Sequence, residues 1–180
     1  DPAQYDYWDH VDYIVETAAA NGIYVAMTPT WRYPALPSTN ALVAYIEQLT
    51  PRYAKRPNII WVNGGSVRPD PNLGLWQAAG AALKRTDPNH LITFHPFGRT
   101  QSSTWFQDAS WLDFNLFASG HRRYDQDKAG KAYGEDNWRY VIEDLAKTPH
   151  KPTLDGEPAY ENTPQGLHKP EEPYWNGDDS

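Results

Sequence analysis

The sequence predicts an α/β fold, and within that class a part of a (β/α)8 barrel. Helical patterns alternate with short apolar runs along the chain. The runs are continuously apolar, as expected for parallel strands covered by helices. Polar and aromatic side chains follow the ends of these runs far more often than they precede them, which is typical of a barrel with its site on one face. A doubly wound open sheet would also alternate, but the glycine-rich first turn usual for nucleotide binding is missing.

The predicted elements follow in a regular order. Apolar residues at helical spacing predict helices over 8–19, 42–53, 73–83 and 138–145. Apolar runs predict strands over 23–28, 59–63, 91–95 and 114–118, and a fifth that ends at Glu157. The first helix stops at Asn21-Gly22, a good C-cap, and the second begins after Pro37-Ser38. Because right-handed crossovers leave little topological freedom, we expect the five strands to be parallel neighbours in sequence order.

The length of the chain limits how much of a barrel it holds. A complete barrel needs eight strands and roughly 250 residues, whereas this chain of 180 residues shows about five strands. We therefore expect an internal piece of a longer catalytic domain, with the partial barrel over residues 1–162 and a loop or tail rich in proline and acidic residues over 163–180. We expect the isolated chain to have low stability, because a partial barrel leaves two sheet edges unpaired and its interior uncovered.

Composition excludes several classes of partner. A net charge of −7 without a clustered basic surface argues against nucleic acid. No apolar run approaches the roughly 20 residues that span a bilayer, so no membrane partner is expected. The absence of cysteine excludes disulfides and thiolate chemistry. No metal or cofactor is expected, since the six histidines lack paired ligand spacing; a site formed in space by His95, His121 and Asp155 is the alternative.

A carboxylate pair closes the last apolar run and is the most informative feature of the chain. Alternate residues of a strand share a face, so Thr153, Asp155 and Glu157 are predicted to line one side. Gly156 leaves room for another backbone or a ligand to approach closely. Glu157 is the candidate nucleophile, because carboxylates at the carboxyl ends of barrel strands carry the chemistry of this fold. The alternative is that Glu157, and still more the deeper Asp155, only anchors a loop.

Several segments resemble one family, the apiosidase-like glycoside hydrolases, which are (β/α)8 barrels often encoded by bacteria that degrade plant cell walls. The resemblance runs from Trp8 to Glu161 in the order of the family. It makes the strand that ends at Asn63 the fourth and the strand that ends at Glu157 the seventh, so the chain would hold about strands three to seven. The segments that carry it are Pro57–Gly65, Asp87–Pro96, Trp111–Asn115, Ser119–His121 and Lys151–Glu161.

The resemblance implies a glycoside hydrolase that acts on side chains of plant cell-wall polysaccharides with retention of configuration. Glu157 matches the nucleophile of this mechanism, and Ser66 occupies the position of the general acid. The partner would be an oligosaccharide or polysaccharide, the location bacterial periplasmic or secreted, and the oligomeric state is not indicated. Residues implied to contact the sugar by stacking or hydrogen bonding are Trp31, Asn63, Arg68, His95, Trp105, His121, Asp155 and Tyr160.

Position 66 departs from the family, which usually reads Asn-Gly-Gly-Asp where this chain reads Asn-Gly-Gly-Ser. A hydroxyl cannot protonate a leaving glycosidic oxygen as a tuned carboxylic acid does. Three explanations stay open: natural loss of function, deliberate inactivation, or a local realignment in which Asp70 is the acid. The main rival function is therefore an inactive, carbohydrate-binding descendant of a glycosidase, and a weaker rival is a metal-dependent hydrolase on the same barrel.

Overall fold

The computed structural model describes residues 4–31, 38–121, 123, 133, 136–165 and 170–175. All five predicted strands and all four predicted helices are present, and β2 runs on past its predicted end at Asn63 to Val67. The short elements β4, α4 and the 3-10 turn η1 were not predicted. The elements are α1 Tyr7–Ala20, β1 Val25–Met27, α2 Thr39–Tyr53, β2 Ile59–Val67, η1 Asp70–Asn72, α3 Leu73–Thr86, β3 Leu91–Pro96, β4 Thr100–Gln101, α4 Ser103–Phe106, β5 Asn115–Ala118, α5 Trp138–Leu145 and β6 Thr153–Asp155.

Local signals in the sequence set the ends of the first two helices. Asp6 caps α1 by accepting hydrogen bonds from the first backbone N–H groups, and the Asp9 side chain returns a bond to the Asp6 N–H, which completes a capping box. The helix ends at Ala20 with Asn21 as its C-cap, and Gly22 follows with a φ of 71° that glycine adopts without strain. The Ser38 hydroxyl caps α2 by accepting from the Ala41 N–H.

The strands form two three-stranded sheets that meet at β3 and β5. In the first sheet β1, β2 and β3 are parallel and in sequence order, and in the second β5 and β6 are parallel while β4 pairs antiparallel with β5. The two sheets are joined where the Asp113 N–H donates to the Ile92 carbonyl at 2.9 Å. The parallel order expected from the sequence is thus confirmed within each sheet, but the five strands do not form one continuous ladder.

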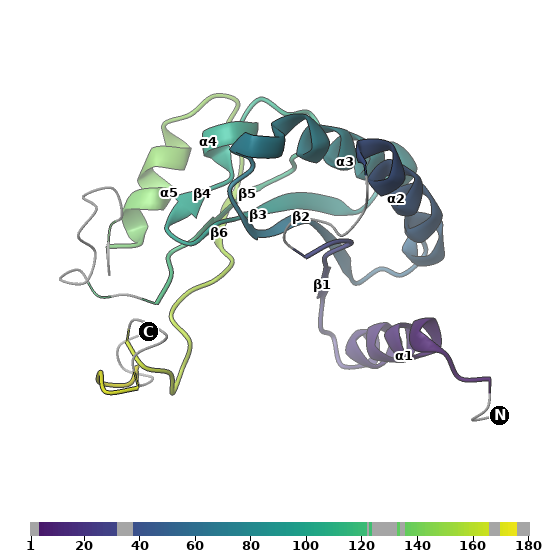
Figure 1. Cartoon of the computed structure of the whole chain (residues 1–180), viewed down its shortest axis with the longest axis horizontal. Helices are drawn as coiled ribbons and strands as arrows, with labels where there is room; N and C mark the ends of the chain where they lie inside the picture. Colours follow the sequence, from purple (N-terminus) through teal and green to yellow (C-terminus); the bar gives the residue numbers. More distant parts are fainter. Residues whose placement is uncertain are drawn as a thin grey trace.

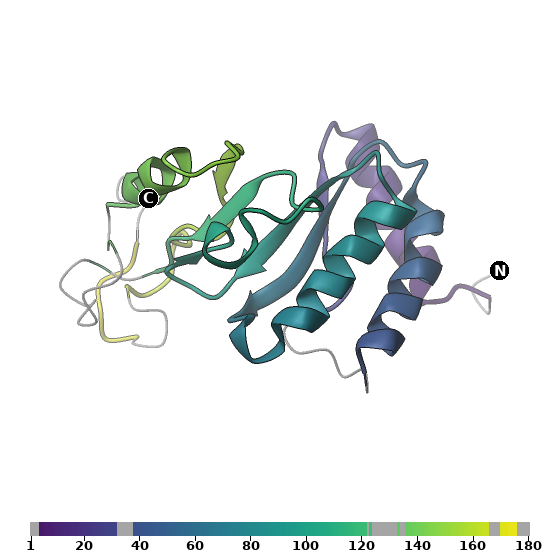
Figure 2. The same cartoon turned by 90° about the horizontal axis from the view of Figure 1, so that it is seen from above.

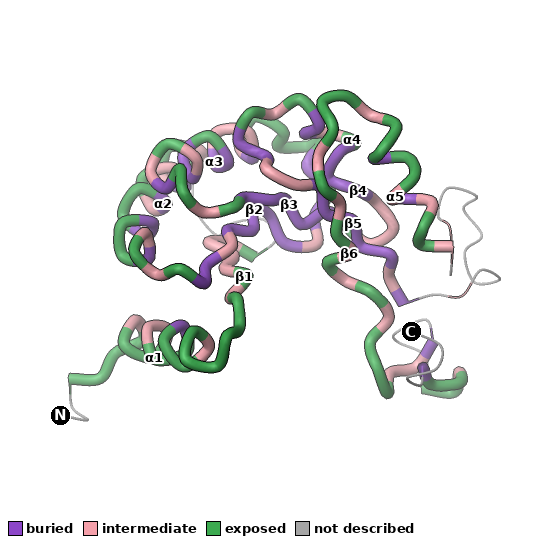
Figure 3. Tube along the Cα trace, turned by 180° about the vertical axis from the view of Figure 1, so that it is seen from behind, coloured by how far each residue is buried: buried purple, intermediate pink, exposed green. Residues whose placement is uncertain are grey.

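The sheets curve into an arch with helices on the outer side. Figure 1 shows α2 and α3 above β2 and β3, while α1 and the segment that follows β6 lie below the strands. Seen from above, α2 and α3 run side by side along the outer face (Figure 2). Buried backbone follows β2, β3 and β5, whereas α1 is mostly exposed (Figure 3). The described residues therefore form an open α/β arch and not a closed barrel.

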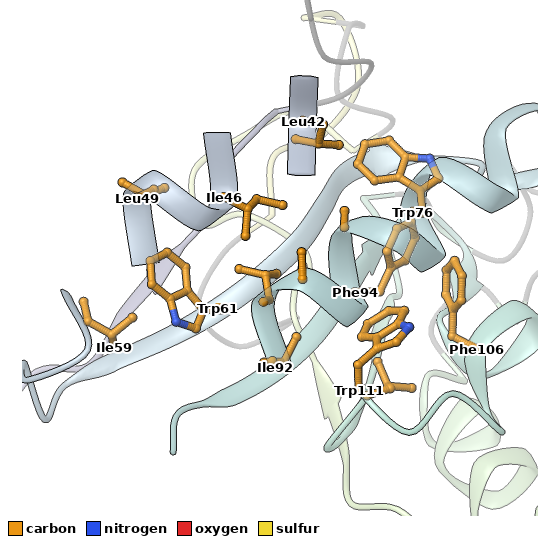
Figure 4. Close-up of a cluster of buried hydrophobic side chains, with 14 of the residues drawn as sticks. Leu42, Ile46, Leu49, Ile59, Trp61, Trp76, Ile92, Phe94, Phe106 and Trp111 are labelled. Atoms are coloured by element: carbon orange, nitrogen blue, oxygen red, sulfur yellow. The ribbon is translucent and has the colours of Figure 1, made fainter. Parts of the chain in front are cut away.

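Alternate residues of β2 divide between the two faces of the arch. Trp61 points toward α2 and α3, where its Nε1–H donates to the buried Asp87 carboxylate at 2.8 Å. Asn63 points the same way and donates to the Trp76 carbonyl at 2.9 Å. The intervening side chains of Ile60 and Val62 face the inner side of the arch. Figure 4 shows Trp61 packed among aliphatic side chains at one end of the outer core, with Trp76, Phe94, Phe106 and Trp111 at the other.

Two glycines of α3 offer a matched test of the packing between α3 and the segment after α4. A Cβ on Gly80 would lie 2.3 Å from the Trp111 ring, whereas a Cβ on Gly74 would meet nothing within 4 Å. We expect Gly80→Ala to lower the free energy of unfolding by about 1–3 kcal/mol, because the buried indole cannot move aside. Gly74→Ala should leave it unchanged or raise it by up to about 1 kcal/mol. Urea unfolding of both variants checks this, and equal effects would contradict the packing.

The described parts of the predicted tail fold back on themselves. Pro164 forms an antiparallel bridge with Tyr174, and Asn162 and Thr163 exchange backbone hydrogen bonds with Trp175. The Trp175 indole is buried and donates to the carbonyl of His121 at 3.2 Å. Residues 166–169 and 176–180 of this tail lie outside the described residues, and the boundary at residue 162 stays a prediction. None of the helices that the structure describes has the length and apolarity needed to cross a bilayer.

Candidate active site

A cavity of about 460 Å³ opens on the inner side of the arch. Its floor is apolar and is formed by inward-facing residues of the strands, among them Ile60, Val62, Leu116 and Leu154. Its rim is polar and aromatic, and follows the carboxyl ends of the parallel strands. The rim residues are Thr28, Trp31, His95, Asp155, Glu157 and Tyr160.

Glu157 enters the cavity because β6 ends two residues before it. The Thr153 hydroxyl points to the outer side and donates to Asp144 of α5 at 3.1 Å, while Leu154 lines the cavity. The prediction that Thr153, Asp155 and Glu157 line one face is therefore wrong, since strand parity does not continue through the turn at Gly156. A Cβ on Gly156 would lie 2.5 Å from a methyl group of Leu116, so the glycine is needed for close approach to β5.

Asp155 is held by hydrogen bonds to the neighbouring strand end. The Ser119 hydroxyl donates to one carboxylate oxygen at 2.6 Å, and the Ser119 N–H lies 3.3 Å from the other. The N–H of Glu157 also lies 3.3 Å from that second oxygen. These contacts tie the loop after β6 to the loop after β5, and they favour the interpretation of Asp155 as a loop anchor.

Three side chains surround the carboxylate of Glu157, whose exposed fraction is 19%. The Tyr160 hydroxyl donates to Oε1, and Nε2 of His121 lies 3.7 Å from the same oxygen. Nε2 of His95 lies 3.5 Å from Oε2. The interaction with His121 is the largest cause that lowers the pKa of Glu157 to about 2, and the Tyr160 hydrogen bond adds to it against the opposing effect of burial. Glu157 is therefore ionised throughout the physiological pH range.

Removing the Tyr160 hydroxyl should raise the pKa of Glu157. The hydrogen bond favours the ionised carboxylate, and it also raises the pKa of Tyr160 to about 12, so Tyr160 stays a donor. A ¹³C NMR titration of labelled glutamate side chains measures the effect of Tyr160→Phe, with Glu157→Gln to assign the resonance. Tyr13→Phe, on an exposed face of α1, is the control. An unchanged titration in Tyr160→Phe would refute the role of the hydroxyl.

The lowered pKa also predicts how stability depends on pH. A carboxyl group with a lower pKa in the folded state stabilises the fold above its ordinary pKa of 4.5, and this stabilisation is lost as pH falls toward about 2. Tyr160→Phe raises the pKa of Glu157 in the folded state, so the variant should lose this stabilisation at a higher pH than the unmodified protein does as the pH falls.

Ser66 lies beside His95 in an unusual backbone conformation. Its φ is 52°, and the ladder between β2 and β3 shifts register between Gly64 and Val67. The Ser66 N–H donates to Nδ1 of His95 at 3.0 Å. The ring of Trp31, 57% exposed, lies with its centroid 5.7 Å from that of His95. Position 66 is thus connected through His95 to Glu157.

The structure brings most of the predicted site residues together. Trp31, His95, Asp155, Glu157 and Tyr160 all line the cavity. His121 is buried behind the rim, and its ring lies 3.9 Å from that of Tyr160 between centroids.

Four other predicted residues do not line this cavity: Asn63, Ser66, Arg68 and Trp105. Asn63 points to the outer core, and Arg68 is exposed on the segment after β2. Trp105 lines a separate hollow of about 660 Å³ between α3 and residues 103–111. Its Nε1–H donates to Asp70 at 2.6 Å, so Asp70, the alternative acid, points toward Trp105 and is not a lining residue of the cavity.

Sequence reasoning gave no role to some residues that build the site. Leu116 and Leu154 form part of the cavity floor, and Ser119 fixes Asp155. Trp175 holds the backbone of His121 from more than fifty residues away. Ser119 could have been found, since it begins the segment Ser119–His121 that the sequence singled out; no local pattern marks Trp175.

The alternative metal site does not form in the described part of the chain. No three side chains of His, Cys, Asp or Glu there are placed to hold a metal ion. His95 and His121 instead face the two oxygens of Glu157.

Parallel β/α units with a carboxylate at the ends of the strands are an arrangement found in (β/α)8 glycoside hydrolases. The family model for the apiosidase-like catalytic domain matches residues 1–180. The chain belongs to this family.

Solved structures agree with this assignment. The chain is 48% identical to a glycoside hydrolase family 5 protein from Bacteroides vulgatus, with a TM-score of 0.91 over 97% of this chain and 39% of that one. It is 46% identical to a second glycoside hydrolase, with a TM-score of 0.90 over 97% of this chain and 41% of that one. The chain thus spans about two-fifths of the length of these relatives.

More distant structures share the fold alone. A β-glucuronidase from Bacteroides uniformis matches 84% of this chain at 13% identity with a TM-score of 0.60. No protein with a curated description matches the chain.

Proposed function

We propose that this chain forms part of a retaining glycoside hydrolase with Glu157 as its nucleophile. The observation that carries the proposal is the place of Glu157: its carboxylate lies on the cavity rim, where Tyr160, His121 and His95 surround it and lower its pKa to about 2. A nucleophile must be ionised at working pH, whereas a general acid needs a raised pKa. The environment of Glu157 therefore suits attack on a sugar and not donation of a proton.

The proposed reaction has two steps. Glu157 attacks the anomeric carbon, the glycosidic C–O bond breaks, and the departing oxygen takes up a proton. Water then attacks the resulting glycosyl ester, loses a proton and releases Glu157. Retention requires a second group about 5–5.5 Å from the nucleophile to supply and then accept that proton. Asp155 does not suit this role, because it lies on the same strand end and is bound by Ser119.

The rim offers surfaces for a sugar. Trp31 and Tyr160 are 57% and 44% exposed beside the carboxylate, and such rings stack on the apolar faces of pyranose or furanose units. Membership of the apiosidase-like family supports side chains of plant cell-wall polysaccharides as the substrate class. We propose that the arch corresponds to strands three to seven of a (β/α)8 barrel, which its structural likeness to two glycoside hydrolases supports.

Trapping the covalent intermediate tests this function. A 2-deoxy-2-fluoro glycoside with a good leaving group slows the second step more than the first and needs little acid assistance. Incubation should add the mass of one fluorosugar to the peptide that contains Glu157, and Glu157→Gln should remove the label. Because the sugar is not identified, the probes are 2-fluoro derivatives of several pentoses and hexoses. A label on another carboxylate would overturn the assignment.

The second candidate is a carbohydrate-binding protein without turnover. Ser66 favours it, because a serine stands where the family usually has the acid. Binding of oligosaccharides, measured by calorimetry, with no trapping of the activated fluorosugars would support this function over the first.

A further inference from the structure

The imidazole of His95 lies between Ser66 and Glu157 and has different neighbours at its two nitrogens. Nδ1 is 3.0 Å from the backbone nitrogen of Ser66 and also 3.0 Å from the carbonyl oxygen of Pro96. Nε2 is 3.5 Å from Oε2 of Glu157. His95 is only 8% exposed, so these contacts decide where its proton lies.

The two neighbours of Nδ1 require opposite protonation states of this nitrogen. A backbone N–H is always a donor, so a bond from Ser66 requires Nδ1 to be an unprotonated acceptor. A bond to the Pro96 carbonyl would require a proton on Nδ1, which would then point at the Ser66 N–H. An N–H without an acceptor is rarer and costs more than a carbonyl that keeps a free lone pair. The bond from Ser66 therefore favours the tautomer with the proton on Nε2.

The backbone around Ser66 is fixed firmly enough to impose this choice. Gly64 has a φ of 77°, and a Cβ there would lie 2.6 Å from the Phe94 ring, so the chain is packed directly on the buried aromatic core. Ser66 itself has a φ of 52°, a left-handed conformation that costs a non-glycine residue about 1 kcal/mol. The shift of register between β2 and β3 directs its N–H at His95.

We propose that the peptide N–H of residue 66 holds His95 in the Nε2–H tautomer, and that His95 is a positioning residue that donates to Oε2 of Glu157. Its contribution to catalysis rests on the proposed function, whereas the tautomer and the contact do not. The carboxylate is then held from both sides, with Tyr160 at Oε1 and His95 at Oε2. His95 thereby acts on the nucleophile, in place of the sugar-hydroxyl contact that the sequence suggested.

One consequence is that the tautomer of His95 does not depend on which side chain stands at position 66, provided that the residue tolerates the left-handed backbone there. Every residue except proline supplies a backbone N–H. A change between serine and aspartate there should leave the orientation of His95, and so of Glu157, intact.

Nitrogen NMR of the unmodified chain tests the tautomer directly. With ¹⁵N-labelled histidine and His95→Gln for assignment, the two ring nitrogens of His95 should show the Nε2–H pattern at neutral pH. A proton on Nδ1, in either the neutral or the doubly protonated ring, would overturn the proposal.

Two substitutions separate the donor from the acceptor function of His95. The amide of asparagine reaches the position of Nδ1, and the amide of glutamine reaches that of Nε2. His95→Asn therefore keeps the bond from Ser66 but loses the donor to Glu157, and should raise the pKa of Glu157 by about one pH unit in a ¹³C titration. His95→Gln keeps the donor, so in this variant the pKa of Glu157 should stay near its value in the unmodified protein. Equal shifts in both variants, or none in either, would overturn the proposal.

Steady-state kinetics with activated aryl glycosides tests whether His95 contributes to catalysis. His95→Asn should lower kcat by about tenfold with little change in KM, because the carboxylate is less well oriented while sugar binding is unaffected. His95→Gln should lower kcat by less than His95→Asn does, because it keeps the donor to Glu157. A rise in KM at unchanged kcat would mean that His95 binds the sugar and is not a positioning residue. A protein that shows the Nε2–H tautomer but traps no fluorosugar on Glu157 would refute the proposed function and leave the His95–Glu157 contact standing.

Discussion

Glu157→Gln is expected to lower the turnover of aryl glycosides with good leaving groups by on the order of 10⁴-fold or more. Glutamine has nearly the same shape and can keep the contacts to Tyr160 and His121, but its amide is neutral and cannot form the glycosyl ester. The loss should lie in kcat, because the cavity and its aromatic rim remain. Since the chain spans about two-fifths of its relatives, the assay belongs in a protein of their full length that carries this sequence.

A nearby glutamate provides the control for this substitution. Glu161 is exposed and lies just beyond Tyr160, so Glu161→Gln makes the same chemical change without touching the cavity. Its turnover should match that of the unmodified protein. Equal losses in the two variants, or activity that survives in Glu157→Gln, would remove Glu157 from the nucleophile role.

Ser66→Asp should raise the rate on substrates with poor leaving groups by about 10²- to 10⁴-fold. Ser66 does not line the cavity, but the resemblance to the family gives position 66 to the general acid. An aspartate there is therefore expected to protonate the departing oxygen, which a serine hydroxyl cannot do. Substrates with good leaving groups need little protonation and should gain much less. The ratio of the two gains, measured across a series of aryl leaving groups, separates acid catalysis from a general improvement of the fold.

Two controls accompany this test. Ser66→Asn has the size of aspartate and tolerates the left-handed backbone of position 66, but it carries no acid, so it should give no gain. Asp70→Asn removes the alternative acid, which is bound to Trp105, and should leave the rate unchanged. No gain in Ser66→Asp together with loss of activity in Asp70→Asn would transfer the acid role to Asp70 and contradict the alignment with the family.

The alternation of helices and parallel strands could be predicted because each element has a strong local signal. Apolar periodicity marked α2 and α3, and turn residues marked their ends. β4 and α4 escaped detection since elements of two and four residues are too short for a period to show. The join between β3 and β5 depends on the curvature of the two sheets, which no local pattern encodes.

The site was predictable to the extent that strand ends could be located. Glu157 and His95 follow directly from their places at the ends of apolar runs. Asn63 was expected at such an end, but β2 continues to Val67, so Asn63 lies within the strand and its parity turns it toward α3. Glu157 was expected on the face of Thr153 for the opposite reason: β6 ends at Asp155, so strand parity does not extend to Glu157.

The hydrogen bond from Trp175 to the His121 carbonyl links two segments that lie far apart in the sequence, so the two can be exchanged between relatives only together. Consider a chimera with the loop around His121 from one family member and the segment around Trp175 from another. In such a chimera the indole and the carbonyl would no longer be matched in position. The imidazole would then shift against Tyr160 and Glu157, although no residue of the cavity rim had changed. Loop grafting between relatives should therefore transfer both segments together, and a truncation after residue 162 would disturb the nucleophile from outside the cavity.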